Sequence, residues 1–167
     1  MHPAALDESE LLKSCETRRQ RRSGPGGQHR NKVETAVVIT HKPTGVKAEA
    51  NERRSQEENR QQAIFRLRLN LALDVRQACQ LPEYAPSETW RTRCRNGRIA
   101  INPTHSDFPT MLAEALDVLT SAAMEVKLAA ESLGCSSSQL IKFLQNEPEA
   151  MVQLNSHRRA AGKPAFH

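Results

Sequence analysis

Apolar residues recur along this chain with two different periods, one typical of strands and one of helices. Residues 36–41 and 46–50 are rich in β-branched and small apolar residues and flank Pro43-Thr44-Gly45. This arrangement predicts two antiparallel strands joined by a tight turn. Residues 7–13 are predicted to form a short helix, and residues 15–22 an extended segment. From residue 55 to about 78, apolar spacings of three and four residues predict a helix that begins at a Ser-x-x-Glu capping box.

Helical periodicity dominates the chain from residue 109 onward. A seam of apolar side chains runs from Leu112 to Leu133 in steps of four and three, which predicts one continuous helix ended by Gly134. A second capping box at 136–139 predicts another helix, and Pro148 suits the first turn of a last helix that ends near Gly162. Residues 82–86 are expected to be a linker, and Ile99 and Ile101 to mark one short strand.

These elements predict an α+β fold, in which a small domain with an antiparallel β-hairpin packed on a helix precedes an all-helical C-terminal region. We expect the mixed domain to span residues 1–106, the helical extension residues 107–156, and a short basic tail residues 157–167. Within the extension, residues 126–140 resemble a helix-turn-helix, with paired alanines, a glycine turn and a serine-rich cap. A plain αα-hairpin that packs on itself or on a protein partner is the alternative, and it is favoured because the second helix offers only Lys142 as a cation.

Charge is distributed unevenly, and this narrows the class of partner. The chain of 167 residues has a formal net charge of +5, and the stretch from Leu11 to Lys32 holds seven cations against one acid, Glu16. Such a cluster beside a glycine-rich loop predicts a polyanionic partner, because guanidinium groups bind phosphates in bidentate fashion. A second cluster, Arg91, Arg93, Arg95 and Arg98, contains no acid and is either a solvated face or an RNA contact.

Other sequence features exclude several classes of protein. No stretch of 18 apolar residues and no basic, then apolar, leader is present, so we expect a cytoplasmic protein that does not contact a membrane. The four cysteines and six histidines are dispersed and match no zinc or disulfide spacing. We therefore expect no metal and no cofactor.

Three ordered motif blocks carry the candidate chemistry. The first is Ser23-Gly24-Pro25-Gly26-Gly27-Gln28, followed by His29-Arg30-Asn31-Lys32; the second is Thr40-His41-Lys42-Pro43-Thr44-Gly45; the third is Arg54-Ser55-Gln56-Glu57-Glu58-Asn59-Arg60. Their order and spacing closely resemble the catalytic domain, with its Gly-Gly-Gln motif, of class I peptide chain release factors and their stand-alone relatives. The resemblance covers about residues 15–75.

The resemblance implies hydrolysis of the ester that joins a nascent peptide to transfer RNA, in the peptidyl-transferase centre of the ribosome. Gly26, Gly27 and Gln28 would be the catalytic residues, with the Gln28 main-chain N–H stabilising developing negative charge and its side chain selecting water. The partners implied are ribosomal RNA and peptidyl-tRNA, and a monomer is expected. His29 is not expected to act as a general base, because no carboxylate is patterned to orient it. The residues expected to bind RNA phosphates are Arg18, Arg19, Arg21, Arg22, Arg30 and Lys32.

The chain lacks a recognisable segment for reading stop codons, since only 25 residues precede Gly26 and nothing after Pro82 resembles one. Codon-independent release of peptides from stalled ribosomes is therefore the expected role. The alternative is a non-catalytic adaptor that binds the ribosome or nucleic acid through its helical region. The intact Gly-Gly-Gln triplet favours the hydrolase, because a binding protein has no steric reason to keep it.

Overall fold

The computed structural model describes residues 1–21 and 35–166, which form two compact units. The first unit holds residue 1 and residues 3–74, and the second holds residue 2 and the chain from Val75 onward. Helices and antiparallel strands are both present, which confirms the predicted α+β class. No described helix is long and apolar enough to cross a membrane.

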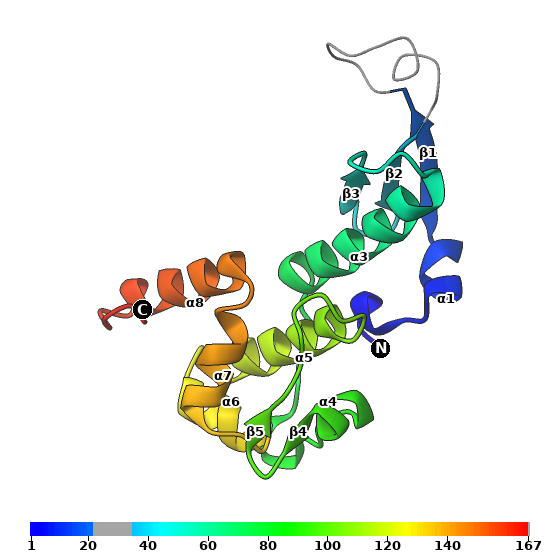
Figure 1. Ribbon diagram of the computed structural model, residues 1–167. Helices are drawn as coiled ribbons and strands as arrows, with labels where there is room; N and C mark the ends of the chain where they lie inside the picture. The colour runs from blue at the N-terminus through cyan, green and yellow to red at the C-terminus, as the bar shows by residue number, and fades with distance from the viewer. Residues whose placement is uncertain (22–34, 167) are drawn as a thin grey trace. The chain divides into compact units, whose positions relative to one another are not determined.

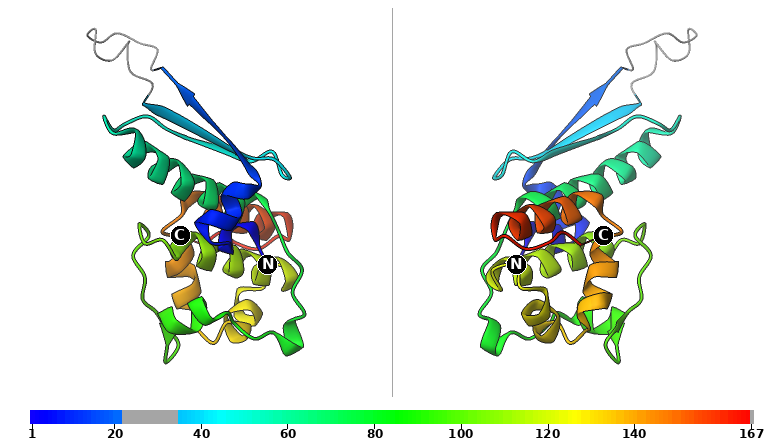
Figure 2. Two further views of the ribbon diagram at one scale, coloured as in Figure 1. Left: turned by 90° about the vertical axis from the view of Figure 1, so that its right-hand side faces the viewer. Right: turned by 90° about the vertical axis from the view of Figure 1, so that its left-hand side faces the viewer.

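The first unit is a three-stranded antiparallel sheet with one long helix against it (Figures 1 and 2). The strand order is β1-β2-β3, and helix α3 packs against β2 and β3. The elements are η1 (Pro3–Ala5), α1 (Glu8–Lys13), β1 (Cys15–Gln20), β2 (Ala36–His41), β3 (Lys47–Ala50) and α3 (Gln56–Asp74).

Side chains along β2 and β3 point alternately to the two faces of the sheet, and those on one face pack against α3. Val37 and Ile39 of β2 are buried and lie opposite Ala50 and Ala48 of β3, which are buried as well. The small alanines let the helix approach the sheet closely, and the apolar stripe of α3 fills the space. Each fully buried large aliphatic side chain contributes about 1.5–3 kcal/mol. The buried apolar residues of α3 are Ala63, Ile64, Leu67, Leu71 and Ala72.

The predicted turn between the two strands is confirmed, and a histidine fixes it. His41 is only 5% exposed, and its Nδ1 lies 2.8 Å from Thr44 Oγ1. Gly45 has φ of +73° and donates its N–H to the His41 carbonyl, a conformation that favours glycine. Burial lowers the pKa of His41 below its usual value. The second motif block therefore builds the hairpin turn.

The second unit is mostly helical and has an aromatic core. Trp90 and Phe108 both contact Phe143, with ring centroids 5.7 and 5.3 Å apart, and Trp90 Nε1 donates to the Leu133 carbonyl at 2.8 Å. Satisfying the indole N–H allows the ring to be fully buried. The elements are η2 (Leu81–Glu83), α4 (Glu88–Arg93), β4 (Cys94–Arg95), β5 (Arg98–Ile99), α5 (Phe108–Ser121), α6 (Val126–Ser132), α7 (Ser137–Leu144) and α8 (Pro148–Ala160).

The continuous helix predicted from Leu112 to Leu133 is wrong, because the structure has two helices there. Helix α5 ends at Ser121, and Ala123 and Met124 adopt φ of +49° and +59°. The Met124 N–H bonds back to the Leu119 carbonyl at 2.8 Å, which closes the end of α5. The apolar spacing persists across the break because both helices bury their stripes in one core. Gly134, with φ of +68°, ends α6 as expected.

Two further boundaries differ from the sequence analysis. Helix α3 ends at Asp74 instead of near residue 78, since the N–H groups of Gln77 and Cys79 bond to the side chains of Asp117 and Ser121. The single strand expected at Ile99 and Ile101 is instead a hairpin of two-residue strands that follows α4. Helix α4 begins where Ser87 Oγ accepts the N–H of Trp90, a cap that the sequence analysis missed.

Buried carboxylates fix the segment predicted to be a linker. Glu114 Oε1 accepts from the Tyr84 hydroxyl at 2.8 Å and from the Ser87 N–H at 2.7 Å, and Oε2 accepts from the Ser87 hydroxyl. Burial and the Glu114 charge raise the pKa of Tyr84, so its hydroxyl stays a donor. By these contacts residues 75–106 pack with the helical unit. The sequence analysis expected the mixed domain to end at residue 106. That limit refers to the release-factor-like domain, and it stays a prediction.

Candidate functional site

The candidate loop joins the paired ends of β1 and β2. These strands are in antiparallel register from Cys15 opposite His41 to Gln20 opposite Ala36. The ladder therefore holds the chain on both sides of residues 22–34 at adjacent positions (Figure 1). The predicted site residues Arg22, Gly26, Gly27, Gln28, Arg30 and Lys32 lie outside the described residues.

Asn59 of α3 anchors the chain where it leaves this loop. Its side chain is fully buried, and its Nδ2 donates to the carbonyls of Thr35 at 2.7 Å and Arg53 at 2.9 Å. Its Oδ1 accepts the Arg53 N–H at 2.9 Å. One amide thus satisfies three main-chain groups, which would each cost about 1–3 kcal/mol if buried without a partner. Thr35 is the first described residue after the loop, so Asn59 fixes the base of the loop to the helix.

The third motif block also starts the helix that carries this asparagine. Ser55 Oγ accepts the N–H of Glu58 at 3.3 Å, which confirms the predicted cap. Arg60 pairs with Glu8 at 2.9 Å and with Glu57 at 3.2 Å, linking α3 to α1. The first turn of α3, with Asn59 in it, is therefore held from two sides.

The described cations beside the loop are exposed on the edge strand β1. Arg18 and Arg19 lie opposite Val38 and Val37, so their side chains leave opposite faces of the sheet. Arg18 Nε pairs with Glu16 at 3.0 Å, but both side chains are more than half exposed, and such pairs contribute little stability. Arg21 follows the strand and is exposed as well. These three predicted RNA-binding residues thus present positive charge next to the loop and on both faces of β1.

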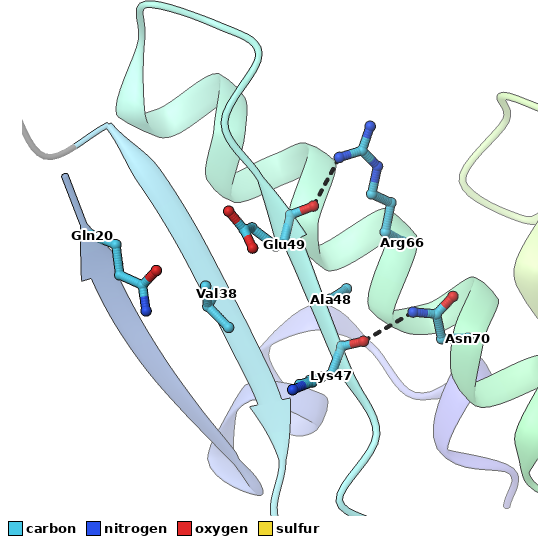
Figure 3. A pocket seen from close by; sticks show the side chains of 7 residues that line it. All are labelled: Gln20, Val38, Lys47, Ala48, Glu49, Arg66 and Asn70. Atoms are coloured by element: carbon cyan, nitrogen blue, oxygen red, sulfur yellow. Dashed lines mark hydrogen bonds between the residues drawn. The ribbon is translucent and has the colours of Figure 1, made fainter. Parts of the chain in front are cut away.

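A groove of about 470 Å³ crosses the sheet beside β3 (Figure 3). Arg66 Nη1 and Asn70 Nδ2, both from α3, donate to the carbonyls of Glu49 at 2.8 Å and Lys47 at 2.9 Å. These bonds occupy outward carbonyls of the edge strand and protect it from pairing with another strand. Arg66 also pairs with the Glu52 carboxylate, and this hydrogen bond lowers the pKa of Glu52. The lining residues are Gln20, Val38, Lys47, Ala48, Glu49, Arg66 and Asn70.

The family model for the RF-1 domain matches residues 9–101, more than half of the chain. The chain belongs to the RF-1 domain family. The match includes the whole β1–β2 frame, the loop between these strands and helix α3. It extends beyond the first compact unit into α4 and the β4–β5 hairpin.

Relatives of this RF-1 domain protein are peptide chain release factors. It is 55% identical over 51 residues to peptide chain release factor 1 of Xylella fastidiosa, which covers 30% of this chain and 14% of the relative. It is 42% identical over 81 residues to the chloroplastic peptide chain release factor PrfB1 of Arabidopsis thaliana, covering 46% and 18%. It is 35% identical over 121 residues to peptide chain release factor 1 of Leptospira biflexa, covering 63% and 34%. The chain thus spans about a third or less of the length of these relatives.

The structure assigns roles to motif residues of the RF-1 domain that the sequence analysis quoted without one. Asn59 and His41 are buried polar residues: Asn59 holds the loop base, and His41 holds the hairpin turn at the other end of β2. Both lie within the quoted motif blocks, but the partners of Asn59, Thr35 and Arg53, become visible only in three dimensions. The groove beside β3 has no sequence signal, because four separate elements, β1, β2, β3 and α3, build it.

Proposed function

We propose that this protein hydrolyses the ester bond of peptidyl-tRNA on cytoplasmic ribosomes, with Gly26, Gly27 and Gln28 as the catalytic residues. The observation that carries the proposal is the intact Gly-Gly-Gln triplet in a chain of the RF-1 domain family, placed between paired strands. The relatives named above are release factors, which supports peptide release as the activity.

The chemistry suits these residue types. Water adds to the ester carbonyl carbon, negative charge develops on oxygen, and the bond to the transfer RNA oxygen breaks as that oxygen takes a proton. A main-chain N–H directed at the developing charge accelerates such a step, and loss of one donor costs about 10²–10³ in rate. Glycine at positions 26 and 27 leaves room for the ester and for a main-chain shape that side chains would obstruct. The Gln28 N–H is the proposed donor, and its side chain selects water.

The frame around the loop supports positioning. The β1–β2 ladder and the Asn59 hydrogen bonds fix the chain on both sides of the loop, which gives the loop a defined point of attachment. Positive charge beside the loop would bind ribosomal RNA phosphates. The cations proposed for this are Arg18, Arg19 and Arg21, exposed on or beside β1, together with Arg22, Arg30 and Lys32 of the loop.

We further propose that release does not depend on a stop codon, so that the protein frees stalled ribosomes. The second unit has a compact helical core around Trp90, Phe108 and Phe143, and the match to the RF-1 domain ends at residue 101, before helices α5 to α8. A role separate from codon reading agrees with both observations.

Release of labelled peptidyl-tRNA tests the proposal. Ribosomes stalled on a truncated messenger are compared with ribosomes that hold a stop codon, using wild type, Gly27→Ala, Gln28→Ala and Gln61→Ala. Gln61 is exposed on α3 and bonds to Glu57, which makes it the matched control. Because the added methyl group obstructs the main-chain shape that directs the Gln28 N–H, we expect release from the truncated complex to fall in Gly27→Ala by about the 10²–10³ that loss of one donor costs, while ribosome binding persists and the control is unchanged. Binding without release by wild type would reject the hydrolase and favour the adaptor.

A further inference from the structure

The β4–β5 hairpin places two arginines directly opposite each other. Arg95 and Arg98 are cross-strand partners, both are exposed, and neither side chain has an ion pair or hydrogen bond with the part of the chain that the structure describes. Asn96 and Gly97 form the turn between them, with φ of +51° and +74°. Such a two-residue turn holds the strands in fixed register. Like charges opposite one another destabilise a strand pair, so the hairpin itself gains nothing from this arrangement.

The hairpin is attached to the start of α7. Gly97 forms a bridge with Cys135, and the Ile99 N–H donates to Gln139 Oε1 at 3.2 Å. Cys94 Sγ lies 3.7 Å from the Gly134 carbonyl. These contacts join the hairpin to the turn before α7 and to its first residues (Figure 1). The two elements therefore present one fixed surface.

A groove of about 180 Å³ lies between them. Arg98 and Lys142 supply two cations and Gln139 a side-chain amide, whereas the Asn146 amide already donates to the Lys142 and Phe143 carbonyls. None of the described residues that line the groove is acidic. Phe143 forms part of the floor and is held by its contacts with Trp90 and Phe108. Since Trp90 and Phe143 are buried, no aromatic face of this cluster is free to stack on a base. The remaining lining residues are Ile99 and Ile101.

Arg93 belongs to the same arginine cluster at residues 91–98, but its side chain has an ion-pair partner. Its Nε and Nη2 lie 3.1 and 2.8 Å from Asp107 Oδ2, and its side chain is half-buried. This arginine fixes the start of α5 to α4. The structure thus divides the cluster into one structural residue, Arg93, and three exposed arginines, of which Arg95 and Arg98 form a cross-strand pair with no partner inside the described chain.

We propose that Arg95, Arg98 and Lys142 form a second RNA-binding surface, which takes the sugar–phosphate backbone without reading bases. Guanidinium groups bind phosphate oxygens in bidentate fashion, and the amide nitrogen of Gln139, whose oxygen accepts from Ile99, suits the same oxygens as a donor. The choice of RNA over an acidic polypeptide rests on the proposed function, which places the chain on an RNA-rich particle. The surface lies on the second unit and would add affinity to that of the cations on β1.

Binding to a fluorescein-labelled RNA hairpin of arbitrary sequence tests this surface without ribosomes or hydrolysis. The full chain is compared with R95Q/R98Q and with K127Q/R159Q, which removes the same charge from exposed positions of α6 and α8. Each phosphate contact contributes about 0.9 to the slope of log affinity against log salt. We expect R95Q/R98Q to weaken binding several-fold and to reduce the slope by about two, with a smaller change in the control. Trp90 fluorescence checks that each variant is folded.

Three outcomes would overturn the proposal or separate it from the proposed function. Equal losses in R95Q/R98Q and K127Q/R159Q would mean that net charge alone matters, and would reject the surface. Loss of binding to poly-glutamate with RNA binding unchanged would assign the surface to an acidic protein instead. If wild type fails to release peptides yet RNA binding still depends on Arg95 and Arg98, the hydrolase fails and the surface stands. Repeating the comparison in an R18Q/R19Q background isolates the second unit.

Discussion

The two units fix irregular segments with buried polar side chains, but with different chemistry. In the first unit a neutral amide, Asn59, holds the base of the candidate loop. In the second unit two carboxylates, Glu114 and Asp117, hold the segment that runs from Val75 to α4. All three side chains are less than a tenth exposed and accept or donate to main-chain groups distant in sequence.

The difference has an energetic consequence. An amide both donates and accepts, so Asn59 satisfies two carbonyls and one N–H without burying a charge. A carboxylate only accepts, and burial penalises its charged form. Burial accordingly raises the pKa of Asp117. The loop that we propose to approach RNA is thus held by a neutral group, whereas the segment from Val75 to α4 is held by acids.

The largest expected effect is that of Asn59→Ala. Removal of the amide leaves the Thr35 carbonyl and both main-chain groups of Arg53 without their partner, and we expect a loss of about 3 kcal/mol in the first unit. Hydrogen exchange of the β2 amides measures the change. Asn70→Ala is the matched control, since Asn70 bonds to one carbonyl at the surface, and it should cost less than about 1 kcal/mol. Equal effects of the two substitutions would remove the special role given to Asn59.

A smaller loss is expected for Glu114→Ala in the second unit. The Tyr84 hydroxyl and the Ser87 N–H lose their acceptor, which costs about 2 kcal/mol. Trp90, the only tryptophan, reports unfolding of this unit by fluorescence. Glu131→Ala on the exposed face of α6 should change stability by no more than about 0.5 kcal/mol. Glu114→Gln keeps an acceptor oxygen, so it should retain much of the wild-type stability; a loss as large as that of the alanine variant would mean that the charge itself is required.

Local signals explain what the sequence could predict of this fold. Strand β2, the turn at Gly45 and the cap at Ser55 follow from β-branched runs, turn residues and capping patterns, each of which acts over a few residues. The break between α5 and α6 leaves no comparable trace. Ala123 and Met124 are ordinary helix formers, and only tertiary packing imposes their positive φ.

Long-range partners account for what the sequence missed at the site. Asn59 lies 24 residues from Thr35, and Glu114 lies 27 residues from Ser87. The spacing of residues within a single helix or strand cannot predict hydrogen bonds between residues so far apart in sequence. The arginine cluster from residue 91 to 98 likewise reads as one patch in sequence, because the contact between Arg93 and Asp107 that divides it depends on the fold.

The smallest expected effect concerns pH and the buried histidine of the first unit. Because burial lowers the pKa of His41 below the usual 6.5, the unfolded chain binds a proton at a pH where the folded chain does not. Stability contributed by the neutral imidazole is therefore present above pH 6.5 and is lost as the pH falls from 6.5 towards the folded pKa. We expect hydrogen exchange of the β2 and β3 amides, corrected for the intrinsic rate, to become faster as the pH is lowered from about 7.5 to about 5.5.

Substitution of His41 decides whether this residue is responsible. His41→Gln has no proton to gain, so its corrected exchange should change less with pH than that of wild type, although the variant is less stable at neutral pH because the bond to Thr44 is altered. His157→Gln, at an exposed position of α8, is the control and should leave the profile of the first unit unchanged. If the pH dependence survives in His41→Gln, another group of the first unit titrates. His41 is then not an ionisable anchor comparable to Glu114 and Asp117, and the comparison between neutral and ionisable anchors does not apply to the hairpin turn.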